Sequence, residues 1–202
     1  MNTPERALLL SLHPRFATAI LEGEKTVELR RQRVAVPPGT PVIIYATSPV
    51  MALIGTARLA SVETAAPAQV WRRHRTACGI TKAEYTAYMD GAAQASALLL
   101  DSPHSLTQAV SLAHLRHTGA FHPPQSYRYL TLDALRQLVA GHEAANELLD
   151  RLAMPRLPAT PSRSAPLRPA SVDRFSRQSS HVLNGAAQCC PLKPECSGSP
   201  LA

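Results

Sequence analysis

A charged segment at residues 23–33, with the sequence GEKTVELRRQR, holds the residues best suited to chemistry. From Thr26 onward polar and apolar residues alternate, which predicts a half-buried strand with Val27 and Leu29 facing a core. The opposite face would carry Thr26, Glu28 and Arg30. Charges on an exposed edge strand discourage aggregation, which is one interpretation of this pattern. The other interpretation is the charged floor of a binding cleft.

Lys25 and Glu28 could act as acid–base groups. A lysine in an apolar, cationic cleft can lose its proton and act as a base. Glu28 could act as a general base toward water if burial made its carboxylate more basic, or it could pair with a neighbouring lysine or arginine. Because the two residues are three positions apart, a regular strand places them on opposite faces. They converge only if Lys25 lies in the turn before the strand.

Arginines in two places suit contact with phosphate, because a guanidinium fork fits phosphate oxygens. Arg30, Arg31 and Arg33 are the candidates in the charged segment. A second basic cluster, residues 72–75, follows Trp71, whose ring could stack on a base. A single tryptophan more often anchors a core, and we favour that interpretation here.

Further polar residues near predicted strand and helix ends could hydrogen-bond a nucleobase or a phosphate. These candidates are His13, Tyr45, Thr47, Ser48 and Gln125. The three between positions 45 and 48 would lie at the mouth of a barrel, although a Ser-Pro pair also fits ordinary turn chemistry. His13 precedes a predicted helix, where it could donate to a phosphate or cap the helix.

The composition narrows the class of protein. The chain has 202 residues, a formal net charge of +7 and a pI of about 9.7, which favour a polyanionic partner such as nucleic acid. No stretch approaches the length of a membrane span, so we expect a soluble cytoplasmic protein without a membrane partner. No disulfide framework is predicted, because three of the four cysteines crowd the C-terminus and Cys78 is alone in the body of the chain. No zinc site is predicted either, because adjacent Cys189 and Cys190 cannot easily share tetrahedral geometry. We expect no metal and no cofactor.

The rest of the sequence predicts the elements that position these residues. Strands are predicted at residues 7–12, 25–31, 41–46, 50–62 and 95–100, and at the end of 121–130. Helices are predicted between Pro14 and Gly23, at 67–75, 81–89 and 112–116, and as a pair within 131–154. Thr81 and Glu84 form a capping box, and Gly55 marks a bulge or a close approach. Strands with little helix between them predict an α+β fold, a small mixed or antiparallel β-barrel flanked by short helices.

The composition changes abruptly at Pro155. From there Pro, Ser, Ala and Arg dominate and apolar periodicity ends, which predicts a disordered tail at 155–202. We therefore predict a domain at 1–130, a helical pair packed on it at 131–154, and the tail. The tail holds six basic and two acidic residues, so it would add sequence-independent attraction to phosphate.

Several segments, in order, resemble the ASCH domain family, a branch of the PUA-like superfamily. They are residues 10–14, 23–31, 45–49 with 54–55, 71 with 79–85, and 123–127. The resemblance covers roughly residues 7–130 and implies a compact β-barrel with a cleft between the barrel and the helices. It also implies RNA binding, which is typical of PUA-like domains. Some small members are amidohydrolases that remove an acyl group from the exocyclic nitrogen of modified cytidine, and a nuclease activity is described within the family.

The resemblance implies roles for three residues. Lys25 matches a lysine of the catalytic set in the hydrolases. Glu28 stands where those hydrolases carry a threonine nucleophile, and a carboxylate cannot simply replace a hydroxyl in attack on an amide. Glu84 resembles their acidic residue, although the capping box with Thr81 explains a glutamate there equally well.

Two classes of function follow from these observations. The first is an RNA-binding module that holds a nucleotide in a charged barrel cleft, with a regulatory role as one option. The alternative is an amidohydrolase acting on an N4-acylated, cytidine-type nucleoside, with Lys25, Glu28 and Glu84 as catalytic residues. Cleavage of RNA is a third option, for which no acid–base pair stands out.

Overall fold

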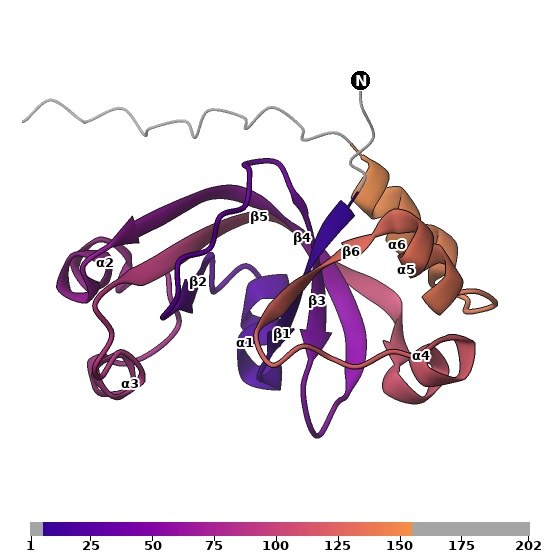
Figure 1. The fold of residues 1–202 in the computed structure, drawn as a ribbon, viewed down its shortest axis with the longest axis horizontal. Coiled ribbons are helices and arrows are strands. Elements are labelled where there is room, and N and C mark those ends of the chain that lie inside the picture. The colour runs from indigo at the N-terminus through magenta and orange to yellow at the C-terminus, as the bar shows by residue number, and fades with distance from the viewer. Residues whose placement is uncertain (1–5, 155–202) are drawn as a thin grey trace, which may run out of the picture. The chain divides into compact units, whose positions relative to one another are not determined.

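The computed structural model describes residues 6–154, which belong to one compact unit (Figure 1). The strands are β1 (Arg6–Leu12), β2 (Val27–Arg30), β3 (Pro41–Ala46), β4 (Ala52–Ala65), β5 (Ala95–Ser111) and β6 (Tyr127–Thr131). The helices are α1 (Pro14–Leu21), α2 (Pro67–His74), α3 (Lys82–Tyr88), α4 (Leu112–Thr118), α5 (Leu132–Leu138) and α6 (Ala145–Ala153). The predicted tail at 155–202 lies outside the described residues. Within 6–154, no helix is both long and apolar enough to cross a membrane.

The predicted α+β class with a mixed sheet is confirmed, but the sheet is not closed into a barrel. Its strand order is β2-β5-β4-β3-β1-β6, with β1 and β3 parallel and the other neighbours antiparallel. The two edge strands, β2 and β6, form no backbone ladder, and a side chain of each one contacts the segment that adjoins the other. Arg30 donates to Ser126 Oγ at 3.0 Å, and the Tyr129 hydroxyl donates to the carbonyl of Ala35 at 3.1 Å.

Two long strands form the middle of the sheet. β5 joins residues 95–100 to the weaker apolar alternation that follows, so it is longer than the predicted strand. Its pairing with β4 shifts register near Gly55, where a bulge or close approach was predicted. A Cβ at Gly55 would lie 2.6 Å from the carbonyl oxygen of His104 and 2.5 Å from the Leu21 side chain. Glycine is therefore required for β4, β5 and α1 to pack this closely.

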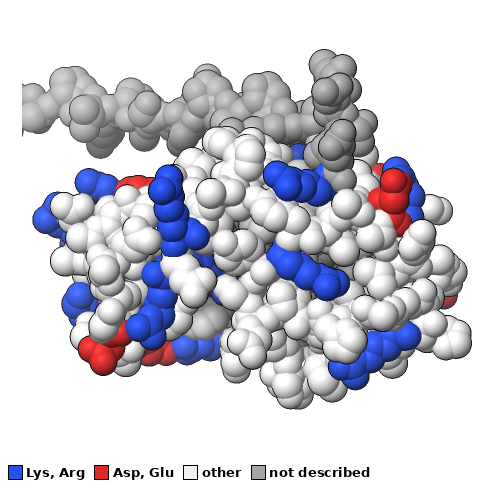
Figure 2. Space-filling model, in the orientation of Figure 1, with Lys and Arg blue, Asp and Glu red and all other residues white. Residues whose placement is uncertain are grey.

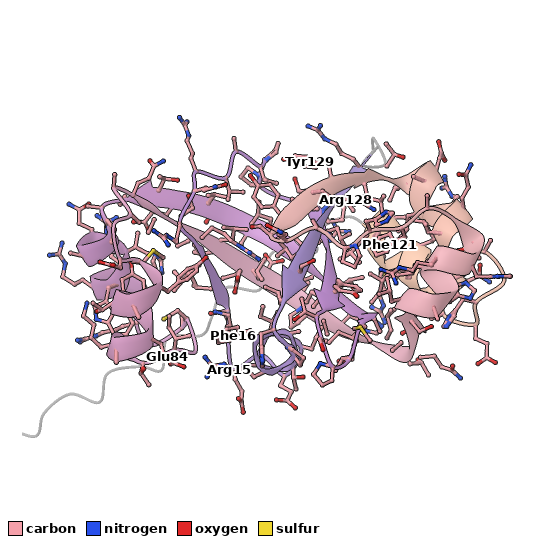
Figure 3. The ribbon with its side chains drawn as sticks, turned by 60° about the horizontal axis from the view of Figure 1, so that its bottom comes forward. Arg15, Phe16, Glu84, Phe121, Arg128 and Tyr129 are labelled. Atoms are coloured by element: carbon pink, nitrogen blue, oxygen red, sulfur yellow. The ribbon has the colours of Figure 1, made fainter. Side chains whose placement is uncertain are left out.

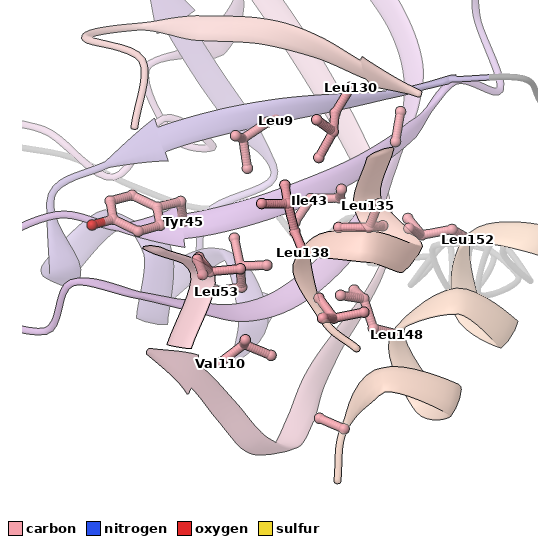
Figure 4. Close-up of a cluster of buried hydrophobic side chains, with 14 of the residues drawn as sticks. Leu9, Ile43, Tyr45, Leu53, Val110, Leu130, Leu135, Leu138, Leu148 and Leu152 are labelled. Carbon is pink, nitrogen blue, oxygen red and sulfur yellow. The ribbon is translucent and has the colours of Figure 1, made fainter. Parts of the chain in front are cut away.

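Hydrophobic side chains bury both faces of the sheet, which explains the continuous apolar run in β1. On one face, Leu8 and Leu10 pack with Ala17 and Ile20 of α1. The other face is covered by α4, α5 and α6, where Leu9 of β1 joins a cluster that continues into the helices (Figure 4). Members of that cluster include Ile43, Leu53, Leu135, Leu138, Leu148 and Leu152. The C-terminal helical pair is thus packed onto the sheet.

A third cluster lies where α2 and α3 cover β2 and one end of β5. Val27 and Leu29 of β2 pack there with Val70 of α2 and Tyr85 of α3, so the two apolar positions of the charged segment face a core. Trp71 packs beside Tyr85, with ring centroids 4.9 Å apart, and it is partly buried at the edge of this cluster instead of at its centre. With its apolar residues packed under these helices, β2 presents its charged residues to the opposite side.

Candidate functional site

A pocket of about 330 Å³ lies between α1, β2 and the segment that carries α3. Its charged and polar lining consists of Ser11, His13, Arg15, Lys25, Glu28, Arg30, Glu84 and Tyr88. Its apolar lining consists of Leu12, Phe16, Leu29 and Ile80. The pocket therefore combines an apolar wall, suited to a flat ring, with charged groups that can bind an anion.

Three charged residues of the 23–33 segment meet at this pocket and are almost completely buried. The exposed fractions are 2% for Lys25, 7% for Glu28 and 8% for Arg30. Lys25 Nζ lies 3.3 Å from one carboxylate oxygen of Glu28, and Arg30 Nη2 lies 3.2 Å from the other. Because β2 begins at Val27, Lys25 precedes the regular strand, which removes the opposite-face problem. We call this arrangement the Lys–Glu–Arg triad.

The ammonium group of Lys25 has an acceptor for each of its three hydrogens. It donates to the carbonyl of Val27 at 2.7 Å and to the carbonyl of Cys78 at 2.5 Å, in addition to its ion pair with Glu28. Gly79 adopts a positive φ of 65° directly after Cys78, which a side chain rarely tolerates, and the Lys25 stem packs against this glycine. Lys25 thus acts as a buried cation that ties the start of β2 to the loop before α3.

Arg30 connects the triad to the opposite edge of the sheet. Its Nη1 donates to Ser126 Oγ at 3.0 Å, and its Nη2 lies 3.4 Å from the carbonyl oxygen of Ser11. Its Nε–H is buried and has no hydrogen-bond partner among the described residues, and neither does the hydroxyl of Ser11. Buried polar groups in native proteins are nearly always paired, so the Nε–H of Arg30 is a donor that lacks its usual acceptor.

An ion pair lies at the mouth of the pocket. Arg15 of α1 and Glu84 of α3 approach one another from the two helices, with Arg15 Nη2 2.6 Å from Glu84 Oε1 (Figure 3). The Arg15 guanidinium also lies over the ring of Phe16, 4.3 Å from its centroid. His13 caps α1, because its Nδ1 accepts from the backbone N–H of Arg15 at 3.3 Å.

Glu84 also completes the capping box predicted for this helix. Its Oε2 accepts from the backbone N–H of Thr81 at 2.8 Å and from the Thr81 hydroxyl at 3.0 Å. These contacts, led by the backbone N–H of Thr81 and followed by the Arg15 guanidinium, lower the pKa of Glu84 from 4.5 to about 2. Glu84 is therefore a carboxylate at neutral pH, and its two oxygens bind the cap residue Thr81 and the guanidinium of Arg15.

The lowered pKa of Glu84 predicts a pH-dependent contribution to stability. A carboxyl group whose pKa falls on folding stabilises the protein fully above its unfolded pKa, here 4.5, and loses that effect as the pH falls through the folded value of about 2. The melting temperature of the protein should therefore exceed that of a Glu84→Gln variant by a constant amount above pH 4.5 and by progressively less below it. Thermal melts of both proteins across this range provide the measurement, and a difference that does not change with pH would contradict the assignment.

Tyr45 lies in a hydrophobic core and does not line the pocket. Its neighbours Ile44 and Ala46 face the α1 side of the sheet, so the alternation of β3 directs Tyr45 to the opposite face. There its ring lies 6.1 Å from that of Phe121, and burial raises the pKa of its hydroxyl. The continuous apolar run of β3 fits burial of both its faces, but the position of Tyr45 at the end of that strand favoured the mouth of a barrel.

The structure also places other predicted contact residues outside the pocket lining. They are Thr26, Arg31, Arg33, Thr47, Ser48, Gln125 and the basic cluster at residues 72–75. Arg31 donates to the carbonyl of Asp90 at 2.6 Å, and the backbone N–H of Thr47 donates to the carbonyl of Leu12 at 2.8 Å. The structure therefore brings together His13, Lys25, Glu28, Arg30 and Glu84 from the predicted set.

Sequence reasoning missed several residues that line the pocket. Phe16 was placed only within the helix predicted between Pro14 and Gly23, and Arg15 beside it received no role. Tyr88 was placed only within the predicted helix at 81–89, and Ile80 only within the family-like segment 79–85. The signal that could have identified Arg15 and Phe16 is their position directly after His13 and Pro14, in the first turn of a helix whose N-terminus faces the charged segment.

Comparison with known proteins identifies the family. The family model for the ASCH domain matches residues 10–102. A protein from Zymomonas mobilis named ASCH domain-containing ribonuclease is 35% identical over 142 residues, which cover 69% of this chain and 95% of that protein. The fold and the pocket thus define a PUA-like α+β domain. The chain belongs to the ASCH domain family, as its motifs predicted.

Two further similarities were found. The crystal structure of ASCH from Zymomonas mobilis superposes with a TM-score of 0.63 at 31% identity, over 68% of this chain and 96% of that one. Large ribosomal subunit protein uL22 from Ureaplasma parvum is 32% identical over 89 residues, but these are 44% of this chain and only 28% of that protein. The ASCH similarity therefore spans a nearly complete relative, and the ribosomal similarity does not.

Proposed function

We propose that this protein binds RNA and holds one nucleotide in the pocket between α1, β2 and α3. The observation that carries this proposal is the state of Arg30. Its guanidinium is buried and held at both Nη atoms, while its Nε–H has no partner among the described residues. A fixed guanidinium with a free donor is suited to an acceptor on a phosphate or a nucleobase.

The shape and charge of the pocket support a nucleotide ligand. Its volume of about 330 Å³ lies within the range of small-molecule sites. Phe16 and Tyr88 provide aromatic surface on which an unstacked base can lie, the usual mode of single-stranded RNA recognition. The lining holds one more basic than acidic residue, and basic side chains outnumber acidic ones on the face shown in Figure 2. Both features favour a polyanion.

The name of the Zymomonas mobilis relative favours RNA over other polyanions and adds a second candidate function, cleavage of RNA. His13 is the group to test for proton transfer in such a reaction, because it is exposed at the pocket mouth. With its Nδ1 accepting from the backbone, a neutral His13 carries its proton on Nε2, from which it can donate.

The geometry favours RNA binding over hydrolysis of an acylated nucleoside. Before Lys25 could act as a base, its ammonium group would have to lose a proton that it now donates to a carbonyl or to Glu28. Glu28, at the position of the hydrolase nucleophile, is held between two cations. Glu84 is engaged by Arg15 and Thr81. Glu28 stands in place of the threonine nucleophile, and Thr26 is outside the pocket lining.

Titration of fluorescently labelled single-stranded RNA with the full chain tests the proposal. We expect binding whose affinity falls at least tenfold between about 50 mM and about 200 mM salt, because cationic side chains displace counterions from phosphate. Electrophoresis of the same RNA after incubation reports cleavage, and a His13→Ala variant tests the role of that imidazole. Absence of RNA binding at the lower salt concentration would contradict the proposed function.

A further inference from the structure

The ion pair between Arg15 and Glu84 is the contact at the pocket that a ligand could most readily replace. Both residues line the pocket, and their side chains are 55% and 38% exposed. Ion pairs at such exposed positions contribute little to stability, because water and salt compete with them. By contrast, the Lys–Glu–Arg triad is buried, and both oxygens of its carboxylate are paired.

The two partners of this ion pair are anchored differently. Glu84 keeps its contacts with the backbone and the hydroxyl of Thr81 even when Arg15 leaves, because these use its other carboxylate oxygen. Among the described residues, the other contact of the Arg15 guanidinium is with the ring of Phe16. A competing anion would therefore take Arg15 from Glu84 and leave α3 and its cap in place.

A phosphate group can replace the carboxylate as the partner of Arg15. An RNA phosphodiester carries one negative charge, as the carboxylate does, and its two non-bridging oxygens match the two parallel N–H groups of a guanidinium fork. Arg15 lies at the mouth of the pocket with its guanidinium over the ring of Phe16, which is part of the apolar wall. A nucleotide whose base lies on that wall would therefore place its phosphate at the mouth, near Arg15.

From these contacts we infer that Arg15 is a phosphate-binding residue at the mouth of the pocket, and that the Glu84 carboxylate occupies the phosphate position in the free protein. The inference rests on the proposed binding of RNA. It gives Glu84 a role opposite to that of a catalytic or ligand-binding residue, because Glu84 competes with the ligand for Arg15. RNA binding then requires exchange of one acidic partner of Arg15 for another.

A Glu84→Gln variant tests this inference, because glutamine preserves the capping box and removes the competing charge. We expect its affinity for single-stranded RNA to rise about twofold to fivefold, the range that an exposed ion pair spans. Glu22→Gln is the matched control, since Glu22 is an exposed acid directly after α1 that is outside the pocket lining. Melting temperatures show that each variant is folded.

The same measurement in an Arg15→Ala background separates the outcomes. We expect Arg15→Ala to weaken binding and to abolish the gain from Glu84→Gln. The inference is overturned if Glu84→Gln binds RNA as the Glu22→Gln control does or more weakly, or if its gain persists without Arg15. Binding by the unmodified chain in those cases leaves the proposed function intact, whereas no RNA binding by any variant overturns both.

Discussion

A Lys25→Met variant is expected to lose about 3 kcal/mol of unfolding free energy, because methionine removes one charge from a buried ion pair and leaves its partners without a donor. The carbonyls of Val27 and Cys78 would then lie unpaired beside a carboxylate that keeps only Arg30. Urea denaturation followed by circular dichroism measures the change. Lys82→Met is the control, since Lys82 is exposed on α3, where its ammonium lies over the rings of Trp71 and Tyr85.

Coupling between the members of the triad gives a second readout of the same prediction. Adding Glu28→Gln to Lys25→Met removes the carboxylate that has lost its lysine, so the double variant should be more stable than the sum of the two single changes implies. A Lys25→Met variant that unfolds at the same urea concentration as Lys82→Met would show that the triad does not support the fold.

An Arg30→Lys variant should bind RNA about tenfold to a hundredfold more weakly than the unmodified protein, because lysine keeps the charge but lacks the fixed fork of donors. Arg33→Lys makes the same chemical change at an exposed position outside the pocket lining and should leave affinity nearly unchanged. Dissociation constants from fluorescence anisotropy, with melting temperatures as a check on folding, provide the comparison. An unchanged affinity in Arg30→Lys would indicate that general charge, which lysine preserves, and not the pocket, binds RNA.

Local sequence patterns predicted the parts of the fold that depend on neighbouring residues. The alternation of Val27 and Leu29 indicated which side of β2 faces a core, and the spacing of Thr81 and Glu84 indicated a capping box. Gly55 was correctly associated with a close approach. These features follow from backbone geometry over a few residues, so a single sequence contains them.

Features that depend on distant segments were not predictable in the same way. Closure of the sheet depends on whether β2 and β6 meet, and the sequence does not show that Arg30 and Tyr129 bridge these edges with side chains. Likewise, Arg15 joins the pocket only because α1 packs opposite α3, far along the chain. Tyr45 was placed at a barrel mouth because its position at a strand end is visible, whereas the helices that bury it follow much later.

The most direct test of the account is a titration of isotopically labelled protein with a short single-stranded RNA, monitored through the arginine Nε–H resonances. We predict that the Nε–H signal of Arg30 moves on binding, because this donor gains an acceptor, and that the signal of Arg15 moves with it. An Arg30 signal that stays fixed while those of Arg72 and Arg75 on the exposed surface at the end of α2 change would contradict the account.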